Sequence, residues 1–582
     1  MPAETTSIRP ERSARRRFFL VMFRSTAIVL ILVVCALTST AGAGTHYFVS
    51  SSEGDDARDG TTPASAWATL ERVRRQTLRP GDTVAFKSGD TFNGQLVVDE
   101  SGSETAPIHF TAYGEGTLPI IDGSGSPGGS ALAAILIEDQ DRLELSRLAV
   151  RNFRKTPKHG KADVNAYGIL IKNTGKRNLR GFELHHLKVE EVYPIRARKS
   201  FNETSVTGIR FETTPARSKK RAFNSGDIYI HDNLIRHTAR FGIALRHRPA
   251  RREGITGTSA DYDTNVRIVK NRCEDLGGSC VLMNGVWGGL LESNTFLRSG
   301  AMVEPELSVN RGSGAWFFRS RYVVAQHNVS VSSRGHNDSS GLHVDFGNED
   351  VLVQYNFFVD NEGYGTEILG KNKNVIWRYN ISVGDGTRRM KDVRPEGGKS
   401  KHPGKTIFIS DFSVPERIQS EGVYIYNNTY VVASGTDPLV ELNGKDLHVW
   451  NNAFLVEEGG RMGRKVNLGW TSGEAVDLRG NVYSGDISPN LILLDAKPTI
   501  ASLRVTGRAA NPEHQPSDYA LDPASLRGSD AGVMIEHPRF PLAGEGIFAH
   551  VDATPVADFF HNVLGDAKAP IGAGYQTSAT GP

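Results

Sequence analysis

Three side chains that could transfer protons stand close together in the sequence. His343 and Asp345 lie in the segment GLHVD at 341–345, and Glu367 lies in GTEIL at 365–369. Imidazole and carboxyl groups are the side chains that most often act as general acids and bases. In both segments polar and apolar residues alternate, which predicts strands that turn the two kinds of side chain to opposite faces. We therefore expect a reactive site on the outer face of a sheet.

A repeat predicts the elements that position these residues. Its core is a run of alternating apolar residues followed by Asn and a second short apolar stretch, as in VLVQYNFFV at 351–359. Between the first and last Asn copies, 248 residues contain eight steps, a mean of 31 residues per step. A period in this range is typical of a solenoid. Nine copies carry Asn at Asn233, Asn271, Asn294, Asn328, Asn356, Asn380, Asn428, Asn452 and Asn481, and two earlier copies carry Leu148 and Leu187.

The repeat predicts an all-β protein built of stacked parallel coils. Each copy is rich in β-branched residues and has no long helical periodicity. About eleven coils would form a rod roughly 50 Å long. We expect Asn at the corner between two strands, because Asn tolerates the left-handed conformation, and stacked Asn side chains would form a hydrogen-bonded ladder. The segment 67–76, with Ala68, Leu70 and Val73 on one face, is predicted to be a helix that caps the open end of the stack.

A second short strand follows each corner, and stacking these strands predicts two outward rows. Neighbours within a row would be about 4.8 Å apart. Trp316 and Phe318 would then lie one coil before His343 and Asp345, and Glu367 one coil after. The first row reads Leu136, Leu170, Arg210, Ala244, Leu282, Trp316, His343, Glu367, Phe408, Glu441, and the second reads Glu138, Lys172, Glu212, Arg246, Asn284, Phe318, Asp345, Leu369, Ser410, Asn443.

The centre of these rows suits a sugar. Sugar rings have apolar C–H faces that pack on aromatic side chains and hydroxyl groups that need polar partners. We expect substrate to contact Trp316, Phe318, Arg210, Lys172 and Asn284. In the alternative interpretation, the loop 302–313 covers the two aromatic residues and the acidic side chains are solvated.

Basic residues flank this centre. The stretch 196–252 contains 14 Lys and Arg residues and four acidic ones, and the loop 384–405 contains seven and three. Such a field would attract an anionic polysaccharide, although these stretches could also be solvated loops. Nucleic acid is not the expected partner of an exported chain. The net charge of the whole chain, +3, indicates no partner class.

The sequence resembles right-handed parallel β-helix proteins of the pectate-lyase-like superfamily. The segments YFVSSSEGDDARDGTTPASAWATLERV and LRPGDTVAFKSGDTF near the N-terminus, the Asn repeats, and the segments YALDPASLRGSDAG, DFF and IGAGY near the C-terminus carry this resemblance. It implies a right-handed parallel β-helix. It does not imply one activity, because the fold carries lyases, hydrolases, epimerases and non-enzymatic adhesins. The chain departs from the pectate-lyase pattern Arg-x-Pro-x-x-Arg and from the polygalacturonase pattern of paired Asp, His-Gly and Arg-x-Lys.

The first hypothesis for function is a polysaccharide lyase that acts by β-elimination. His343 would accept the C5 proton of a uronate, oriented by Glu367. Arg246 or Arg210 would neutralise the uronate carboxylate. A Ca²⁺ ion could do so instead, and its predicted ligands are Asp338, Asp345, Asp360 and Glu362, although their spacing matches no calcium motif.

Two other hypotheses use the same face. In an inverting glycoside hydrolase, Asp345 and Glu367 would be the two carboxyl groups, with Cβ atoms about 8 Å apart in the expected register. In a non-catalytic adhesin, the aromatic and basic face would only bind polysaccharide. The lyase is the preferred interpretation at this stage.

The N-terminus predicts an exported protein. Arginines at 9–17, an apolar run at 26–37 and Ala41-Gly42-Ala43 form a secretory signal with cleavage before Gly44, and an uncleaved N-terminal anchor is the alternative interpretation. We expect a secreted, periplasmic or cell-surface location and no membrane span in the mature chain. The predicted divisions are the signal at 1–43, a cap with first coils at 44–129, the β-helix at 130–484 and a closing segment at 485–582. Cys273 and Cys280 could form a disulfide or remain two buried thiols, and nothing indicates the oligomeric state.

Overall fold

The computed structural model describes residues 44–575, except for 127–128, 157–162, 197–204, 215–222, 248–256, 302, 391–399, 401, 470–474, 508–513, 528–529 and 566–569. The chain divides into two units, Met1–Gly44 and Thr45–Pro582. The predicted signal at 1–43 lies outside the described residues, as do most of the basic residues counted at 196–222 and 248–252.

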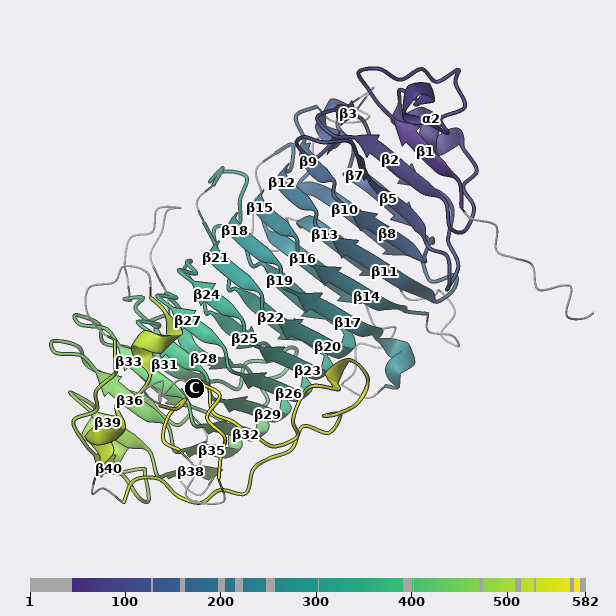
Figure 1. The fold of residues 1–582 in the computed structure, drawn as a ribbon. Coiled ribbons are helices and arrows are strands. Elements are labelled where there is room, and N and C mark those ends of the chain that lie inside the picture. The colour runs from purple at the N-terminus through teal and green to yellow at the C-terminus, as the bar shows by residue number, and fades with distance from the viewer. Residues whose placement is uncertain are drawn as a thin grey trace, which may run out of the picture. The chain divides into compact units, whose positions relative to one another are not determined.

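The unit Thr45–Pro582 is a right-handed parallel β-helix of three sheets, as predicted (Figure 1). Each coil contributes one strand to sheet A, then one to sheet B, then one to sheet C, and neighbouring strands within each sheet run parallel. Sheet A contains β1 (His46–Val49), β2 (Thr83–Lys87), β5 (Ile108–Tyr113), β8 (Leu143–Ser146), β11 (Leu179–His185), β14 (Ser225–His231), β17 (Asp263–Val269), β20 (Val286–Glu292), β23 (Arg321–Gln326), β26 (Glu349–Gln354), β29 (Lys373–Arg378), β32 (Glu421–Tyr426), β35 (Lys445–Trp450) and β38 (Val476–Arg479).

Sheet B follows the Asn corners. It contains β3 (Thr91–Asn93), β6 (Ile120–Asp122), β9 (Ala149–Phe153), β12 (Lys188–Tyr193), β15 (Leu234–Thr238), β18 (Arg272–Leu276), β21 (Thr295–Ser299), β24 (Val329–Val331), β27 (Phe357–Val359), β30 (Ile381–Val383), β33 (Thr429–Val432), β36 (Ala453–Val456), β39 (Val482–Ser484) and β40 (Thr499–Ile500).

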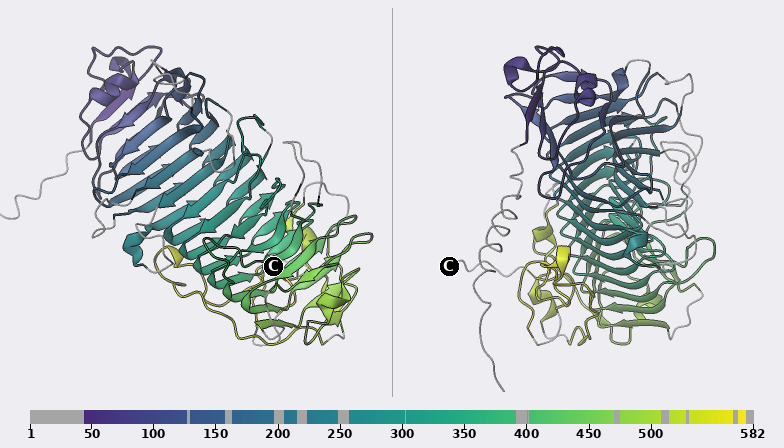
Figure 2. Two further views of the ribbon diagram at one scale, coloured as in Figure 1. Left: turned by 180° about the vertical axis from the view of Figure 1, so that it is seen from behind. Right: turned by 90° about the vertical axis from the view of Figure 1, so that its right-hand side faces the viewer.

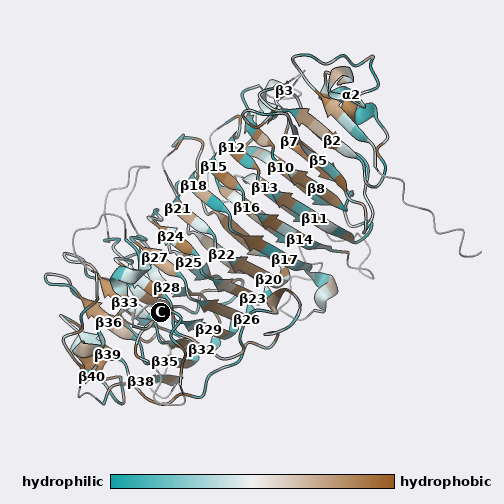
Figure 3. Cartoon of the chain, viewed as in Figure 1, coloured by the Kyte–Doolittle hydropathy of each residue, from teal (hydrophilic) through white to brown (hydrophobic). Residues whose placement is uncertain are grey.

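Sheet C carries the two predicted rows. It contains β4 (Leu96–Val98), β7 (Ala133–Glu138), β10 (Asn165–Asn173), β13 (Ser205–Thr213), β16 (Phe241–His247), β19 (Val281–Asn284), β22 (Ala315–Phe318), β25 (Leu342–Val344), β28 (Tyr364–Ile368), β31 (Lys405–Ile409), β34 (Leu439–Leu442) and β37 (Val466–Asn467). Apolar residues of all three sheets form one continuous buried core. Figure 3 shows hydrophobic and hydrophilic residues mixed along the strands.

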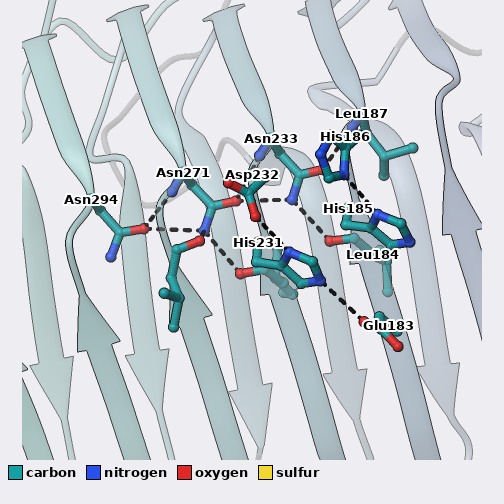
Figure 4. A network of polar contacts seen from close by, with 12 residues as sticks. Glu183, Leu184, His185, His186, Leu187, His231, Asp232, Asn233, Asn271 and Asn294 are labelled. Carbon is teal, nitrogen blue, oxygen red and sulfur yellow. Dashed lines mark hydrogen bonds and ion pairs between the residues drawn. The ribbon is translucent and has the colours of Figure 1, made fainter.

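The Asn ladder exists in the predicted register. From Asn233 to Asn481, the side-chain amide of each Asn donates to the side-chain oxygen of the Asn in the next coil, over 2.9–3.1 Å. Figure 4 shows the first steps, and Asp495 accepts the last bond. The ladder therefore satisfies buried backbone groups at every corner it crosses.

One detail of the corner differs from the prediction. The left-handed residue is the one directly before the ladder position, not the Asn itself, and its φ is 51–56° in ten coils and 72° at Gly480. Residues as different as Lys270, His327 and Tyr379 adopt it. Where the next residue is Asn, its hydrogen bonds support this conformation, which also occurs before Leu148 and Leu187, so the corner does not require one residue type at that position.

A second polar row runs through the corner between sheets B and C. Asn361 donates to the backbone oxygen of Ser330 over 3.1 Å and to Oδ1 of Asp385 over 2.9 Å. Asp385 is 5% exposed, and Ser382 Oγ donates to its second oxygen over 2.7 Å. Burial raises the pKa of Asp385 to about 7, although these hydrogen bonds lower it.

Asp385→Asn is expected to stabilise the protein at neutral pH. The folded state holds the Asp385 proton up to about pH 7, whereas the unfolded chain releases it near its ordinary value of 3.8. The wild type therefore loses stability as pH rises from about 4 to 7, and the variant lacks this loss, which is on the order of 2–4 kcal/mol. Urea unfolding of both proteins at several pH values measures the difference. A constant difference across this pH range would contradict the prediction.

A short helix covers the N-terminal end of the stack. This helix, α2 (Leu70–Arg75), buries Leu70 and Val73, as the cap prediction requires, and follows η2 (Pro63–Ser65). Near the C-terminal end, α3 (Pro489–Ile492) lies between β39 and β40 and buries Leu491. Short 3₁₀ turns occur at η3 (Gly123–Gly125), η5 (Ser259–Asp261), η7 (Pro516–Tyr519), η8 (Pro523–Leu526) and η9 (Gly546–Phe548).

The C-terminal tail returns along the outside of the coils, as the views in Figure 2 show. Phe540, Phe548 and Val551 pack on the outward side chains of sheet A, from Leu290 in β20 to Trp450 in β35. Tyr519, Leu521 and Ile571 pack on sheet B. The tail is thus a covering segment and not a separate globular domain.

Two further points concern the sequence predictions. Cys273 and Cys280 form a disulfide between β18 and the start of β19. Among the described residues, none of the helices is both long and apolar enough to cross a membrane.

Candidate active site

The outward rows of sheet C have the register that the sequence predicts. Trp316 in β22 pairs with His343 in β25, and Val344 pairs with Ile368 in β28, which places Glu367 in the coil beside His343. The rest of the first row is also paired, from Leu136 to Trp316 and from Glu367 to Glu441. His343 therefore lies between an aromatic residue and a carboxyl group.

His343 is the centre of a buried polar cluster. It is 2% exposed, and its Nδ1 lies 3.1 Å from Ser313 Oγ and 3.4 Å from Glu367 Oε2. Its Nε2 lies 4.0 Å from Asp345 Oδ2. Burial lowers the pKa of His343, but Glu367, Asp345 and Asp338 outweigh this effect and raise the pKa to about 9. The imidazole is therefore protonated at neutral pH.

Glu367 contacts His343 from the neighbouring coil. It is 1% exposed and accepts a hydrogen bond from Ser340 Oγ over 2.5 Å. Burial raises the pKa of Glu367 to about 7, against the opposing effect of His343. Because three carboxyl groups act on the imidazole, the proton of this pair resides on His343. Glu367 is as deeply buried as His343, so its position suits the predicted role of orienting His343, and its direct reaction with substrate stays a prediction.

Asp338 is a carboxylate at the edge of the cluster. Its side chain is 25% exposed and pairs with Arg311, whose Nη2 lies 2.5 Å from Asp338 Oδ2. Burial raises the pKa of Asp338, but Arg311 and His343 outweigh it, so the net shift is downward and the group stays ionised. From the sequence, Asp338 is predicted only as a metal ligand, because the loop that carries it has no repeat.

The turn at Asp338 is tightly packed. Asp338 and Ser339 are both left-handed, with φ values of 49° and 68°, a conformation that Asp tolerates better than Ser. Gly363 of the next coil lies so close that a Cβ there would be 1.8 Å from the Asp338 carbonyl oxygen. A side chain at Gly363 would therefore displace the turn that carries Asp338.

Asp345 lies on the other side of His343. Its side chain is 11% exposed, and Oδ1 accepts from the Phe346 N–H over 2.8 Å. Next to it, the Trp316 ring centroid is 5.4 Å from that of His343, and the half-buried Trp316 and Phe318 pack on Phe241, Ala244 and Leu282. Among the described residues Trp316 Nε1 has no hydrogen-bond partner. These side chains form an aromatic wall beside the acids.

The predicted cations of sheet C are mostly neutralised. Arg210 is only 2% exposed and lies 3.4 Å from Glu212, so it does not present a free cation as expected. Lys172 pairs with Glu138 over 2.6 Å. Arg246 and Asn284 are half-buried and lie on neighbouring coils, next to Phe318 in the second row.

The predicted calcium ligands do not converge. Asp360 pairs with Arg334 over 2.5 Å, whereas Asp338 pairs with Arg311. Glu362 accepts from the Gly335 N–H over 3.0 Å. Within the described part of the chain no three His, Cys, Asp or Glu residues are grouped to hold a metal ion. Calcium binding stays a prediction.

Comparisons with known proteins were made for sequence and for structure. No protein-family model matches the chain. A lacto-N-biosidase of Bifidobacterium longum subsp. longum is 23% identical over 577 residues, covering 85% of this chain and 35% of the relative, so the chain spans about a third of that protein. The structure resembles GH136 lacto-N-biosidase from Eubacterium ramulus, with a TM-score of 0.51 for the native protein and 0.50 for its selenomethionine derivative. Each is 19% identical, and the match covers 78% of this chain and 67% of that chain. The structural likeness shows the fold.

Proposed function

We propose that the protein is a glycoside hydrolase whose active site is centred on His343 in sheet C. The observation that carries this proposal is that two carboxyl groups act on one buried protonated imidazole: Asp338, whose side chain is 25% exposed, and Asp345, whose side chain is 11% exposed. Most glycosidases use two carboxyl groups that flank the scissile bond. The sequence likeness to a lacto-N-biosidase supports the same reaction class.

The roles of the residues follow from their surroundings. Asp338 is held ionised by Arg311, so it is suited to stabilise the oxocarbenium-like transition state or to act as nucleophile or base. Asp345, mostly buried but more exposed than Glu367, is the remaining carboxyl group and would protonate the leaving oxygen. His343 and Glu367 hold these carboxyl groups in place, and Trp316 offers a ring face to the sugar.

A lyase is less well supported by this geometry. The base of a β-elimination must accept a proton, and His343, with a pKa of about 9, already carries one at neutral pH. Arg210, one candidate to neutralise a uronate, is buried against Glu212. The inverting mechanism was inferred from Asp345 and Glu367, and the burial of Glu367 weakens that argument. The stereochemistry is therefore left unassigned.

The test is product analysis with the chain from Gly44 onward. We would incubate it with neutral and acidic oligosaccharides and with p-nitrophenyl β-lacto-N-bioside, and follow reducing ends, nitrophenol and ultraviolet absorbance in the same wells. New reducing ends or nitrophenol without ultraviolet absorbance are expected. Unsaturated products would identify a lyase, and binding without any product would identify an adhesin.

A further inference from the structure

A cavity of about 540 Å³ opens on the outer face of sheet A, away from the sheet that carries the candidate active site. Its floor comes from β17 and β20 and from the residues that lead into β11 and β14. Its roof comes from the C-terminal tail at η9 and from η5, and in Figure 1 a yellow segment of the tail passes beside β20 and β23. The volume lies within the usual range of roughly 300–1,000 Å³ for small-molecule sites.

Trp287 provides a rigid aromatic wall. Its ring is half-buried and is held by Tyr262 and Tyr322, whose centroids lie 5.6 and 5.1 Å away at 58° and 64°. The guanidinium carbon of Arg321 lies 5.4 Å from the ring centroid, and Arg321 is itself paired with Glu349. A ring fixed in this way binds a flat apolar surface at low entropic cost. Ile547 and Phe548 of the tail add apolar surface.

Fixed polar groups line the rest of the cavity. Arg180 Nη2 donates to Asn224 Oδ1 over 2.7 Å, and Asn224 Nδ2 donates to the Ser259 carbonyl over 3.1 Å. Asn265 Nδ2 donates to Asp227 Oδ1 over 2.6 Å, and Asn178 Oδ1 accepts from the Asn224 N–H over 3.0 Å. An amide group offers both a donor and an acceptor, which matches the hydroxyl groups of a sugar.

The charges in the cavity favour a neutral ligand. Arg180 lies 3.9 Å from Asp227, and Glu545 is the one carboxylate among the residues that line the cavity. A single carboxylate does not supply the pair that glycoside hydrolysis needs.

We propose that this cavity is a second, non-catalytic carbohydrate-binding site that holds a neutral sugar unit against Trp287. It would tether a glycan to one face of the solenoid while the face formed by sheet C acts on another part of it or on another chain. This inference goes beyond the proposed hydrolase and does not require it, because binding here uses none of the residues around His343.

The test measures glycan binding separately from hydrolysis. An array of neutral oligosaccharides is probed with the full chain, with Trp287→Ala, and with Ala260→Trp. The last variant fills the cavity from the exposed residue Ala260 without removing any packing. We expect both variants to lower binding at least tenfold on the glycans recognised through this site. Hydrolysis of p-nitrophenyl β-lacto-N-bioside should be unchanged where the wild type shows it.

A control variant tests whether removal of any half-buried aromatic residue from sheet A lowers binding. Tyr424→Ala removes another half-buried aromatic residue of sheet A, which stacks on His448 outside the cavity, and should leave array binding unchanged. Wild-type binding that persists in Ala260→Trp, or that falls equally in Tyr424→Ala, would overturn the proposal. If the wild type bound the array but hydrolysed none of the substrates, the result would contradict the proposed hydrolase and not this binding site.

Discussion

Asp345→Asn and Asp338→Asn are each expected to lower kcat about a thousandfold or more on any substrate that the protein hydrolyses. The first change removes the carboxyl proton donor beside His343, and the second removes the ionised carboxylate paired with Arg311. Both replacements keep the size of the side chain. Initial rates measured with p-nitrophenyl glycosides and with oligosaccharides give kcat and KM for each variant.

Glu367→Gln is the informative companion to these variants. Glu367 is the carboxyl group that raises the pKa of His343 most, so its removal should lower the pKa of His343 from about 9. If the rate falls at high pH because His343 loses its proton, this fall should occur at lower pH in Glu367→Gln than in the wild type. The variant should also lose less kcat than Asp345→Asn. An unchanged profile, or an Asp345→Asn variant that keeps a tenth of the activity, would contradict these assignments.

Asn356→Ala is expected to destabilise the protein by about 3–5 kcal/mol. The amide of Asn356 donates to the carbonyls of Ala325 and Gln354 and to Asn380 Oδ1 over 2.9–3.0 Å, and its oxygen accepts from the N–H and the amide of Asn328 over 3.0 Å. All of these groups are buried, so truncation leaves them without partners or water. Denaturant unfolding followed by circular dichroism measures the loss.

An exposed Asn provides the control. Asn467→Ala, at the edge strand β37, should change stability by less than about 0.5 kcal/mol, because its side chain is exposed and accepts a local bond from the Gly469 N–H. If Asn356→Ala were as mild as this control, the ladder would not be a principal source of stability.

The fold could be predicted because one physical requirement recurs in most coils. A buried amide holds each corner from Asn233 to Asn481, so these Asn residues mark the coils in the sequence, and alternation around them sets the register of Trp316, His343 and Glu367. The left-handed position before each Asn leaves no such mark, because many residue types can occupy it. A shorter ladder of Asn348 and Asn372 at another corner was likewise missed, since it involves only a few coils.

The site could be predicted only in part. The row positions predicted His343, Asp345 and Glu367. Which of them can meet a substrate depends on how the surrounding loops bury them, and the alternation of polar and apolar residues carries no information about those loops. Those loops carry Asp338, Arg311 and Ser313. Whether these residues come close to His343 depends on turns such as the left-handed pair Asp338 and Ser339. The segment HNDSSG contains typical turn residues, which is the one signal that could have drawn attention to it.

The returning tail changes how the solenoid can come apart. In a stack where each coil contacts only its neighbours, the end coils can unfold one at a time. Here the tail packs on sheet A from β20 to β35 through Phe540, Phe548 and Val551. The same segment is also held by polar contacts, because Arg378 donates to the Asp552 carbonyl and His550 contacts Glu292. Fraying of the last coil must therefore release the tail from strands several coils away. The C-terminal half is expected to open as one cooperative block, whereas the coils before β20 retain the gradual behaviour of a simple stack.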